Sequence, residues 1–105
     1  FSQGAGLTFA AGLKNHDLVD GIAPFGGWLD TRLFGDDAIL DANSLPVYLA
    51  HGINDKTIEI STGDFAHDIL KKAGYNIEFD RFDGGHQVLE DVLNSAIEWL
   101  QKNSN

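Results

Sequence analysis

A serine, an aspartate and a histidine in this chain have the side-chain types that together can carry out acyl transfer. The chain begins Phe1-Ser2-Gln3-Gly4 and continues into a predicted helix of small residues. A serine two places before a glycine, at the start of such a helix, is typical of a sharp strand-to-helix turn that exposes the hydroxyl. The helix N-terminus would point its N–H groups and dipole at the reacting centre. Read as G-x-S-x-G, the motif lacks only its first glycine.

The other two candidates each follow a predicted strand. Asp55 stands in the stretch H-G-I-N-D at 51–55, and His86 ends the stretch D-G-G-H at 83–86. Open α/β sheets place ligands at the carboxyl ends of their strands, so Ser2, Asp55 and His86 are predicted to share one rim of a sheet. Their order along the chain, Ser then Asp then His, is the order found in α/β-hydrolases.

The chemistry assigns a role to each residue. The Ser2 hydroxyl is a poor nucleophile near neutral pH and needs a base within hydrogen-bond reach. The His86 imidazole can take that proton and return it to the leaving group. The Asp55 carboxylate would fix the imidazole tautomer and stabilise the imidazolium. The backbone N–H of Gln3 would be one oxyanion donor, and we expect the other in a part of the domain that precedes this chain.

Each residue also has a structural interpretation. Ser2 could be only a helix N-cap, Asp55 a turn residue and His86 an exposed loop histidine. His51 is interpreted as a structural residue that holds its loop, and His16 and His67 as surface residues. The three candidates, in the right order at three strand ends, favour the triad.

Other residues with chemical potential are weaker candidates. Trp28 and Leu29 are predicted to line an acyl pocket, although an aromatic residue after a strand is as often part of the core. Asp36, Asp37 and Asp41 lack the spacing of a calcium loop and are predicted to form a solvated face. We therefore expect no metal site and no cofactor.

Composition narrows the class of protein. The 105 residues are 43% hydrophobic, with 12 glycines and 2 prolines, as in a globular protein. The formal net charge of −9 argues against nucleic acid and anionic membrane surfaces as partners. The absence of cysteine excludes disulfides and thiol nucleophiles. We see no signal peptide and no membrane-spanning apolar run. The sequence leaves the compartment open and slightly favours the cytoplasm.

Helices and strands are predicted to alternate. The predicted helices are at 3–14, 61–73 and 88–102, the predicted strands at 19–25, 46–52 and 76–82, and an ordered loop is predicted at 30–44. This alternation indicates a parallel α/β sheet with helices on its faces. The run at 46–52 has no polar alternation, as expected of a strand covered on both sides. The run at 76–82 alternates, as expected of an edge strand with one wet face.

The sequence also predicts the ends and the buried sides of two helices. Ser61 is predicted to cap the helix at 61–73, with Asp64 in capping-box position and Gly74 as its stop. Its predicted buried stripe is Phe65, Ala66, Ile69, Leu70 and Ala73. The predicted buried side of the last helix is Val88, Val92, Leu93, Ala96, Trp99 and Leu100.

Three strands are too few for a sheet of this kind. The apolar strand run at 47–50 and the first helix, which is apolar around nearly its whole circumference, need to pack against surfaces that this chain does not supply. We therefore expect residues 1–105 to be the C-terminal part of one domain, incomplete without an N-terminal half that would be its main partner. That half could be a separate chain or residues outside this sequence.

The chain resembles the phospholipase/carboxylesterase group of α/β-hydrolases, which includes the acyl-protein thioesterases. The motifs that carry the resemblance are F-S-Q-G at 1–4, G-G-W-L at 26–29, H-G-I-N-D at 51–55 and G-G-H at 84–86. The resemblance implies the C-terminal half of an α/β-hydrolase fold. It also implies a serine esterase or thioesterase with Ser2 as nucleophile, Asp55 as acid, His86 as base and a small ester as substrate. One departure is Ile58-Glu59-Ile60, where the family often has a valine-proline pair.

Two rivals remain at this stage. The first is a non-catalytic α/β module whose loops bind a ligand or another protein. The second, within the enzyme class, is a lysophospholipase or a polysaccharide-ester hydrolase. Nothing in these residues decides the acyl length.

Overall fold

The computed structural model describes residues 1, 8, 20–27, 29 and 36–103. The elements in this part of the chain are α2 (Asp36–Asp41), β1 (Val47–Gly52), α3 (Ile60–Lys72), β2 (Ile77–Phe82) and α4 (Glu90–Asn103). Of the helix predicted at 3–14, only Thr8 is described, and it is helical.

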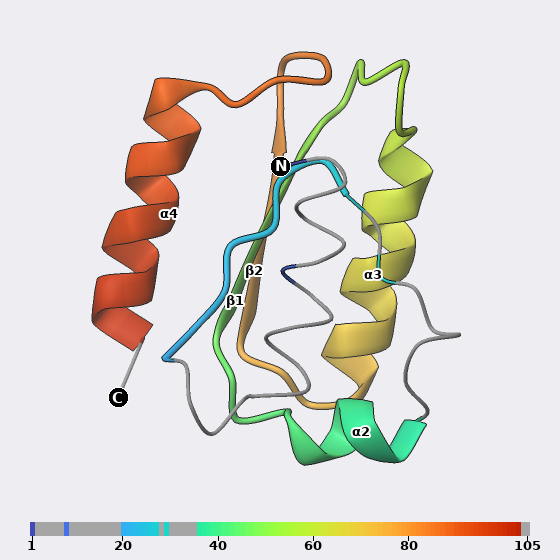
Figure 1. Ribbon diagram of the computed structural model, residues 1–105, viewed down its shortest axis with the longest axis vertical. Helices are drawn as coiled ribbons and strands as arrows, with labels where there is room; N and C mark the ends of the chain where they lie inside the picture. Colours follow the sequence, from blue (N-terminus) through green and yellow to red (C-terminus); the bar gives the residue numbers. More distant parts are fainter. Residues whose placement is uncertain (2–7, 9–19, 28, 30–35, 104–105) are drawn as a thin grey trace.

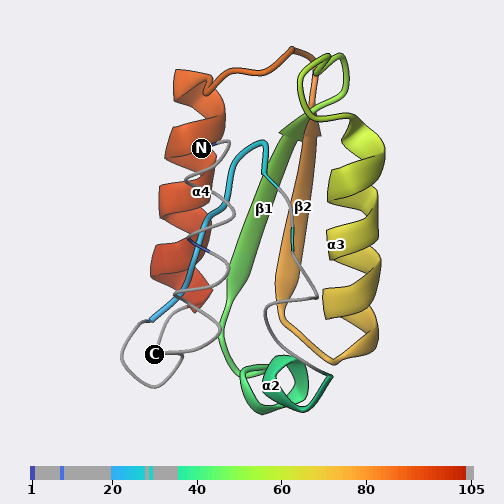
Figure 2. The same ribbon diagram turned by 45° about the vertical axis from the view of Figure 1, so that its right-hand side comes forward.

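The described elements form three layers. Strands β1 and β2 pair in parallel, from Val47 opposite Ile77 to Gly52 opposite Phe82. Helix α3 packs on one face of this pair and α4 on the other, as Figures 1 and 2 show. Both strands run toward the same end of the molecule, and α2 lies at the opposite end. The predicted parallel sheet with helices on both faces is confirmed.

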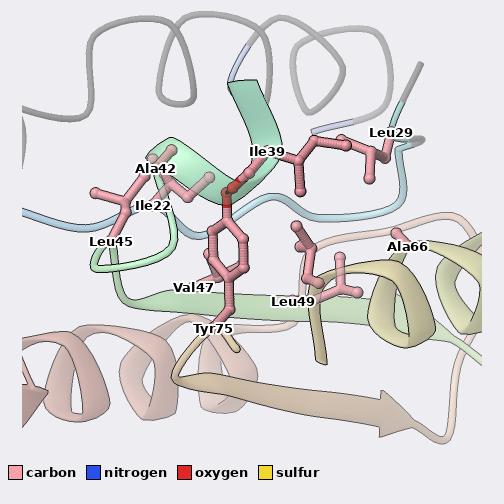
Figure 3. Packing of buried hydrophobic residues seen from close by; sticks show 10 residues of the cluster. Ile22, Leu29, Ile39, Ala42, Leu45, Val47, Leu49, Ala66 and Tyr75 are labelled. Atoms are coloured by element: carbon pink, nitrogen blue, oxygen red, sulfur yellow. Dashed lines mark hydrogen bonds between the residues drawn. The ribbon is translucent and has the colours of Figure 1, made fainter. Parts of the chain in front are cut away.

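Strand β1 is buried along its whole length, as its uninterrupted apolar run predicts. Successive side chains of a strand point to opposite faces. Val47 and Leu49 accordingly join the cluster beneath α3 (Figure 3). Tyr48 and Ala50 join a second cluster, beneath α4. Side chains of β1 therefore contribute to two hydrophobic cores, one on each face of the strand.

Strand β2 has one neighbour among the described strands, β1. Its side chains are half-buried or exposed except for Phe82. This is the wet edge that its alternating sequence predicts.

The segment at 20–27 lies along the other side of β1 (Figure 1). It contacts β1 through two isolated parallel bridges, at Ile22 and Phe25, and is not a continuous strand there. Pro24, predicted to end this strand, lies between the two bridges. Its carbonyl accepts from the N–H of Ala50 at 3.1 Å, but the proline has no N–H to donate in return. The predicted strand at 19–25 is thus correct in position, although Val19 lies outside the described residues.

The predicted N-cap of α3 is wrong. The cap is Glu59, whose carbonyl accepts from the N–H of Thr62, and Ser61 lies inside the helix. Asp64, predicted for a capping box, instead pairs with Arg81 of β2 at 3.2 Å. The predicted stop is correct, because Gly74 follows the helix with φ +89° and donates to the carbonyl of Lys71.

Some apolar positions predicted to be buried are exposed. On α3, Ala66 and Leu70 are buried, but Phe65 is 51% exposed. On α4, Val92 and Ala96 are buried, but Leu93 is 42% exposed. Val88 precedes the helix and is also exposed. Helical spacing defines an apolar stripe, but the width of that stripe that is covered depends on what packs against it.

The loop predicted at 30–44 contains a short helix, α2, so this prediction is wrong over residues 36–41. Ile39 of α2 is buried in the cluster beneath α3 that also contains Val47 and Leu49, which we call the α3-side core. Its carbonyl accepts a hydrogen bond of 2.6 Å from the hydroxyl of Tyr75, which points toward α2 from the start of β2 (Figure 3). Six residues are too few for a periodic pattern, and a distant tyrosine holds this helix in place.

Candidate functional site

Two loops meet at the end of the sheet where β1 and β2 finish. The first runs from β1 to α3 and the second from β2 to α4, and both lie at the top of Figure 1. They are joined by backbone hydrogen bonds, from the N–H of Ile53 to Phe82 and from the N–H of Asn54 to Gly84, each 2.9 Å. The parallel register of the strands therefore brings the two loops into direct contact.

Asp55 and His86 are hydrogen-bonded across these loops. Nδ1 of His86 lies 2.7 Å from Oδ2 of Asp55. The other carboxylate oxygen, Oδ1, accepts the N–H groups of Thr57 at 2.9 Å and Ile58 at 2.8 Å. Asp55 is 5% exposed, so its carboxylate is held almost entirely by protein groups. The arrangement leaves Nδ1 of His86 as the donor to a fixed acceptor.

These contacts set the protonation of the acid. Burial alone would raise the pKa of the Asp55 carboxyl, because it penalises the charged form. The N–H of Ile58, the imidazole of His86 and the N–H of Thr57 outweigh burial and hold the pKa below its ordinary value of 3.8. Asp55 is thus a carboxylate at neutral pH.

Glycine is required where the two loops approach. A Cβ at Gly52 would overlap the carbonyl oxygen of Gly85 and lie 2.5 Å from that of Gly84. A Cβ at Gly85 would meet nothing closer than 3.8 Å. The close approach therefore depends on Gly52. This glycine directly precedes the loop at 53–59 that carries Asp55, which we call the acid loop.

Phe1 contributes a contact that the sequence analysis did not predict. Its ring centroid lies 4.7 Å from that of His86. Gly26, with φ +61°, lies under both rings, because a Cβ there would meet Phe1 at 3.2 Å and His86 at 3.6 Å. The signals that could have suggested this contact are an aromatic residue directly before the candidate serine and the paired glycines at 26–27.

Several predicted site residues lie outside the described part of the chain. They are Ser2, Gln3 and Trp28, together with His16. Leu29, predicted for an acyl pocket, is described and is buried in the α3-side core. His67 is half-buried, and its ring centroid lies 5.0 Å from that of Phe79.

The described residues hold no group of three or more His, Cys, Asp or Glu side chains that could bind a metal ion. Within the same residues, no helix is long and apolar enough to cross a membrane. A hollow of about 650 Å³ lies between the edge of β2 and α4 and is lined by Tyr48, Asp80 and Trp99 among others. It is separate from the Asp55–His86 pair.

The chain has part of an α/β-hydrolase fold, with parallel strands between helices and the Asp55–His86 pair at their carboxyl ends. A model of the phospholipase/carboxylesterase family matches residues 1–104. The chain belongs to this family, as its motifs predict.

Two relatives show how much of a family member the chain represents. A probable carboxylesterase SOBER1-like protein of Arabidopsis thaliana is 34% identical over 108 residues, covering 97% of this chain and 40% of that protein. Acyl-protein thioesterase 1 of Gibberella zeae is 30% identical over 106 residues, covering 97% of this chain and 45% of that protein. The chain thus spans about half the length of the curated relatives it matches.

Solved structures agree with this placement. The crystal structure of Arabidopsis thaliana SOBER1 superposes with a TM-score of 0.82 and 29% identity, over 98% of this chain and 50% of that one. The crystal structure of esterase PE8 superposes with a TM-score of 0.77 and 26% identity, over 98% of this chain and 47% of that one. The relatives therefore include carboxylesterases and acyl-protein thioesterases, which are hydrolases.

Proposed function

We propose that this chain carries the catalytic triad of a serine hydrolase that cleaves carboxylic esters or thioesters through an acyl-enzyme. In this proposal Ser2 is the nucleophile, His86 the general base and Asp55 the acid that orients it. The observation that carries it is the 2.7 Å hydrogen bond between Nδ1 of His86 and Oδ2 of Asp55, at the carboxyl ends of adjacent parallel strands. Family membership and the F-S-Q-G sequence at 1–4 support the choice of Ser2.

The reaction follows from these roles. With Nδ1 of His86 donating to Asp55, Nε2 is the nitrogen that takes the Ser2 proton as Oγ attacks the carbonyl carbon. The backbone N–H of Gln3 would donate to the oxyanion. The leaving alcohol or thiol then takes the proton from Nε2, and the acyl group stays on Oγ. In a second round, Nε2 takes a proton from water as the water oxygen attacks the acyl carbon. The bond from the acyl carbon to Oγ then breaks, Oγ takes the proton back from Nε2, and the carboxylic acid is released.

Phe1 adds support because it precedes Ser2 in the chain. Its ring packs on the His86 imidazole. Through this contact Phe1, the residue directly before the proposed nucleophile, lies beside the proposed base. Trp28 is proposed to border the acyl pocket, whereas Leu29, predicted for the same role, is buried in the α3-side core.

The proposal extends to the domain. Residues 1–105 would be the C-terminal part of one α/β-hydrolase domain, with an N-terminal part supplying the remaining strands and the second oxyanion donor. The chain's span of about half its relatives supports this arrangement. Activity is therefore expected of the full-length protein that contains both parts.

Labelling with a fluorophosphonate tests the nucleophile. We expect the full-length protein to react, Ser2→Ala to lose all labelling, and the control Ser61→Ala, an exposed serine of α3, to label normally. Hydrolysis of a short-chain aryl ester and of its thioester analogue should follow the same pattern. Labelling that persists in Ser2→Ala would exclude this serine, and a protein that neither labels nor hydrolyses would favour the non-catalytic module.

A further inference from the structure

A second histidine, His51, lies beneath the loop that carries Asp55. It is the next-to-last residue of β1 and is 0% exposed. Its Nε2 lies 2.6 Å from the carbonyl oxygen of Ile58 and 3.4 Å from Oδ2 of Asp55. This histidine therefore lies close to two residues of the acid loop, Asp55 and Ile58.

The partners of His51 determine where its proton is. A carbonyl oxygen only accepts, so Nε2 carries a hydrogen and donates it to Ile58. Nδ1 has no hydrogen-bond partner among the described residues and packs against Gly63 of α3, where a Cβ would lie 3.1 Å away. A hydrogen on Nδ1 would be buried without an acceptor, so the geometry assigns the ring hydrogen to Nε2.

Ile58 connects this histidine to the carboxylate. Its carbonyl is held by His51, while its N–H donates to Oδ1 of Asp55 at 2.8 Å. The N–H of Thr57 donates to the same oxygen. With Oδ1 occupied by two backbone donors, Oδ2 is the oxygen presented to His86.

We propose that His51 is a positioning residue for the triad: by holding Ile58 it fixes the rotation of the Asp55 carboxylate and so aims Oδ2 at Nδ1 of His86. The catalytic consequence rests on the proposed function, whereas the effect on the carboxylate does not. Among the residues that the structure describes, the titratable groups in contact with this carboxyl are His86 and His51. A histidine that only filled space in the core would leave the titration of the carboxyl unchanged when replaced.

Two substitutions of His51 separate the donor from the bulk, both made in the full-length protein. His51→Leu removes the donor, whereas His51→Gln places an amide N–H₂ near the position of Nε2. The matched control is His67→Leu, because His67 lies on α3 and packs on Phe79 of the same sheet. Each variant is assayed for kcat and KM on a short-chain aryl ester, for thermal stability, and for titration of the Asp55 carboxyl by ¹³C NMR.

We expect His51→Leu to lower kcat by about 10- to 100-fold with little change in KM, because the acid is misaligned and substrate binding is not. Its Asp55 carboxyl should titrate at higher pH than in the wild type. His51→Gln should recover most of both properties, and His67→Leu should match the wild type in both. The ¹⁵N spectrum of the wild type should show the His51 hydrogen on Nε2.

The proposal is overturned if His51→Leu only loses thermal stability, with kcat and the Asp55 titration unchanged. It is equally overturned if the His51 hydrogen is found on Nδ1, a measurement that needs no variant to fold. If the wild type neither labels nor hydrolyses esters, the proposed function fails, and the Asp55 titration still decides the role of His51.

Discussion

At the scale of single residues, the Asp55 carboxylate shows how hydrogen bonds stabilise a buried negative charge. Its two oxygens have separate tasks, since Oδ1 accepts two backbone N–H groups and Oδ2 accepts from His86. Backbone donors cannot be titrated, so one side of the acid is held regardless of the state of the histidine. The carboxylate can therefore stay ionised while the imidazole gains and loses a proton.

Asp55→Asn tests the orienting role under the proposed mechanism. The amide keeps the size of the side chain but can donate to Nδ1, which favours the wrong tautomer of His86. We expect kcat on a short-chain aryl ester to fall by about 10⁴-fold. The control is Asp83→Asn, because Asp83 is exposed at the end of β2. A comparable loss in the control, or activity within tenfold of wild type in Asp55→Asn, would contradict the assignment.

The lowered pKa of Asp55 also predicts a pH dependence of stability. A carboxyl whose pKa is depressed by folding stabilises the protein above its unfolded pKa, near 3.8. That contribution is lost as the pH falls through the lower folded pKa. Urea unfolding of wild type and Asp55→Asn should therefore show a free-energy difference that is constant at neutral pH and shrinks below about pH 3.8. A difference that stays the same at pH 3 would mean that the carboxyl is not stabilised by these contacts.

At the scale of elements, the site depends on two loops that touch through their backbones. The last residue of β1, Gly52, faces the carbonyl groups of Gly84 and Gly85 in the loop that ends at His86. The distance between Asp55 and His86 is therefore set by how closely β1 and the following loop of β2 approach.

Gly52→Ala should force that approach apart. The added methyl would overlap backbone carbonyl oxygens, which cannot rotate away as a side chain does. We expect the free energy of unfolding to fall by about 1–3 kcal/mol and esterase activity to fall with it. Gly85→Ala is the matched control, since its methyl would meet only ordinary contacts, and its stability should change by less than about 0.5 kcal/mol. Equal behaviour of the two variants would show that the contact does not position the loops.

A hydrogen bond between the hydroxyl of Tyr75, just before β2, and the carbonyl of Ile39 helps to attach α2, whose Ile39 is also buried in the core. Tyr75→Phe leaves that buried carbonyl without its donor and should lower the free energy of unfolding by about 1–3 kcal/mol. Burial raises the pKa of Tyr75 to about 12, from an ordinary value of 10.0. Its stabilising effect is thus complete below pH 10 and lost as the pH rises toward 12. Denaturant unfolding of both proteins at pH 8 and pH 11 should show their difference shrinking, and an unchanged difference would contradict this.

At the scale of the whole molecule, the described surface includes large apolar side chains on α4. Leu93 and Ile97 lie one turn apart on α4 and are 42% and 46% exposed. Buried neighbours on the same helix, Val92 and Ala96, already face the sheet. The exposed pair is therefore a second apolar face of α4, consistent with a chain that spans about half of its relatives.

Replacing both Leu93 and Ile97 by glutamine in the full-length protein tests whether the proposed N-terminal part covers this face. Glutamine is a good helix former, so any effect comes from lost burial. We expect the free energy of unfolding to fall by about 2 kcal/mol. Glu98→Gln, an exposed position on the same helix, should change it by less than about 0.5 kcal/mol. A double variant as stable as this control would mean that the face stays in solvent.

The sequence alone determined the elements whose signals are local. The uninterrupted apolar run at 46–52 predicted a buried strand, the alternation at 76–82 predicted an edge, and Gly74 marked the end of a helix. These three predictions agree with the structure because strand pleat and helix termination depend on neighbouring residues. The same local strand signals placed Asp55 and His86 directly after predicted strands.

Only the tertiary structure decided which surfaces and partners those elements meet. It exposed Phe65 and Leu93 on stripes predicted to be buried, and it formed α2 through a tyrosine 36 residues along the chain. It also joined His51 to the carbonyl of Ile58, where the sequence predicted a structural histidine that holds its loop but did not identify its partner. Periodicity specifies the direction in which a side chain points, but what lies there is set by residues far away in the chain.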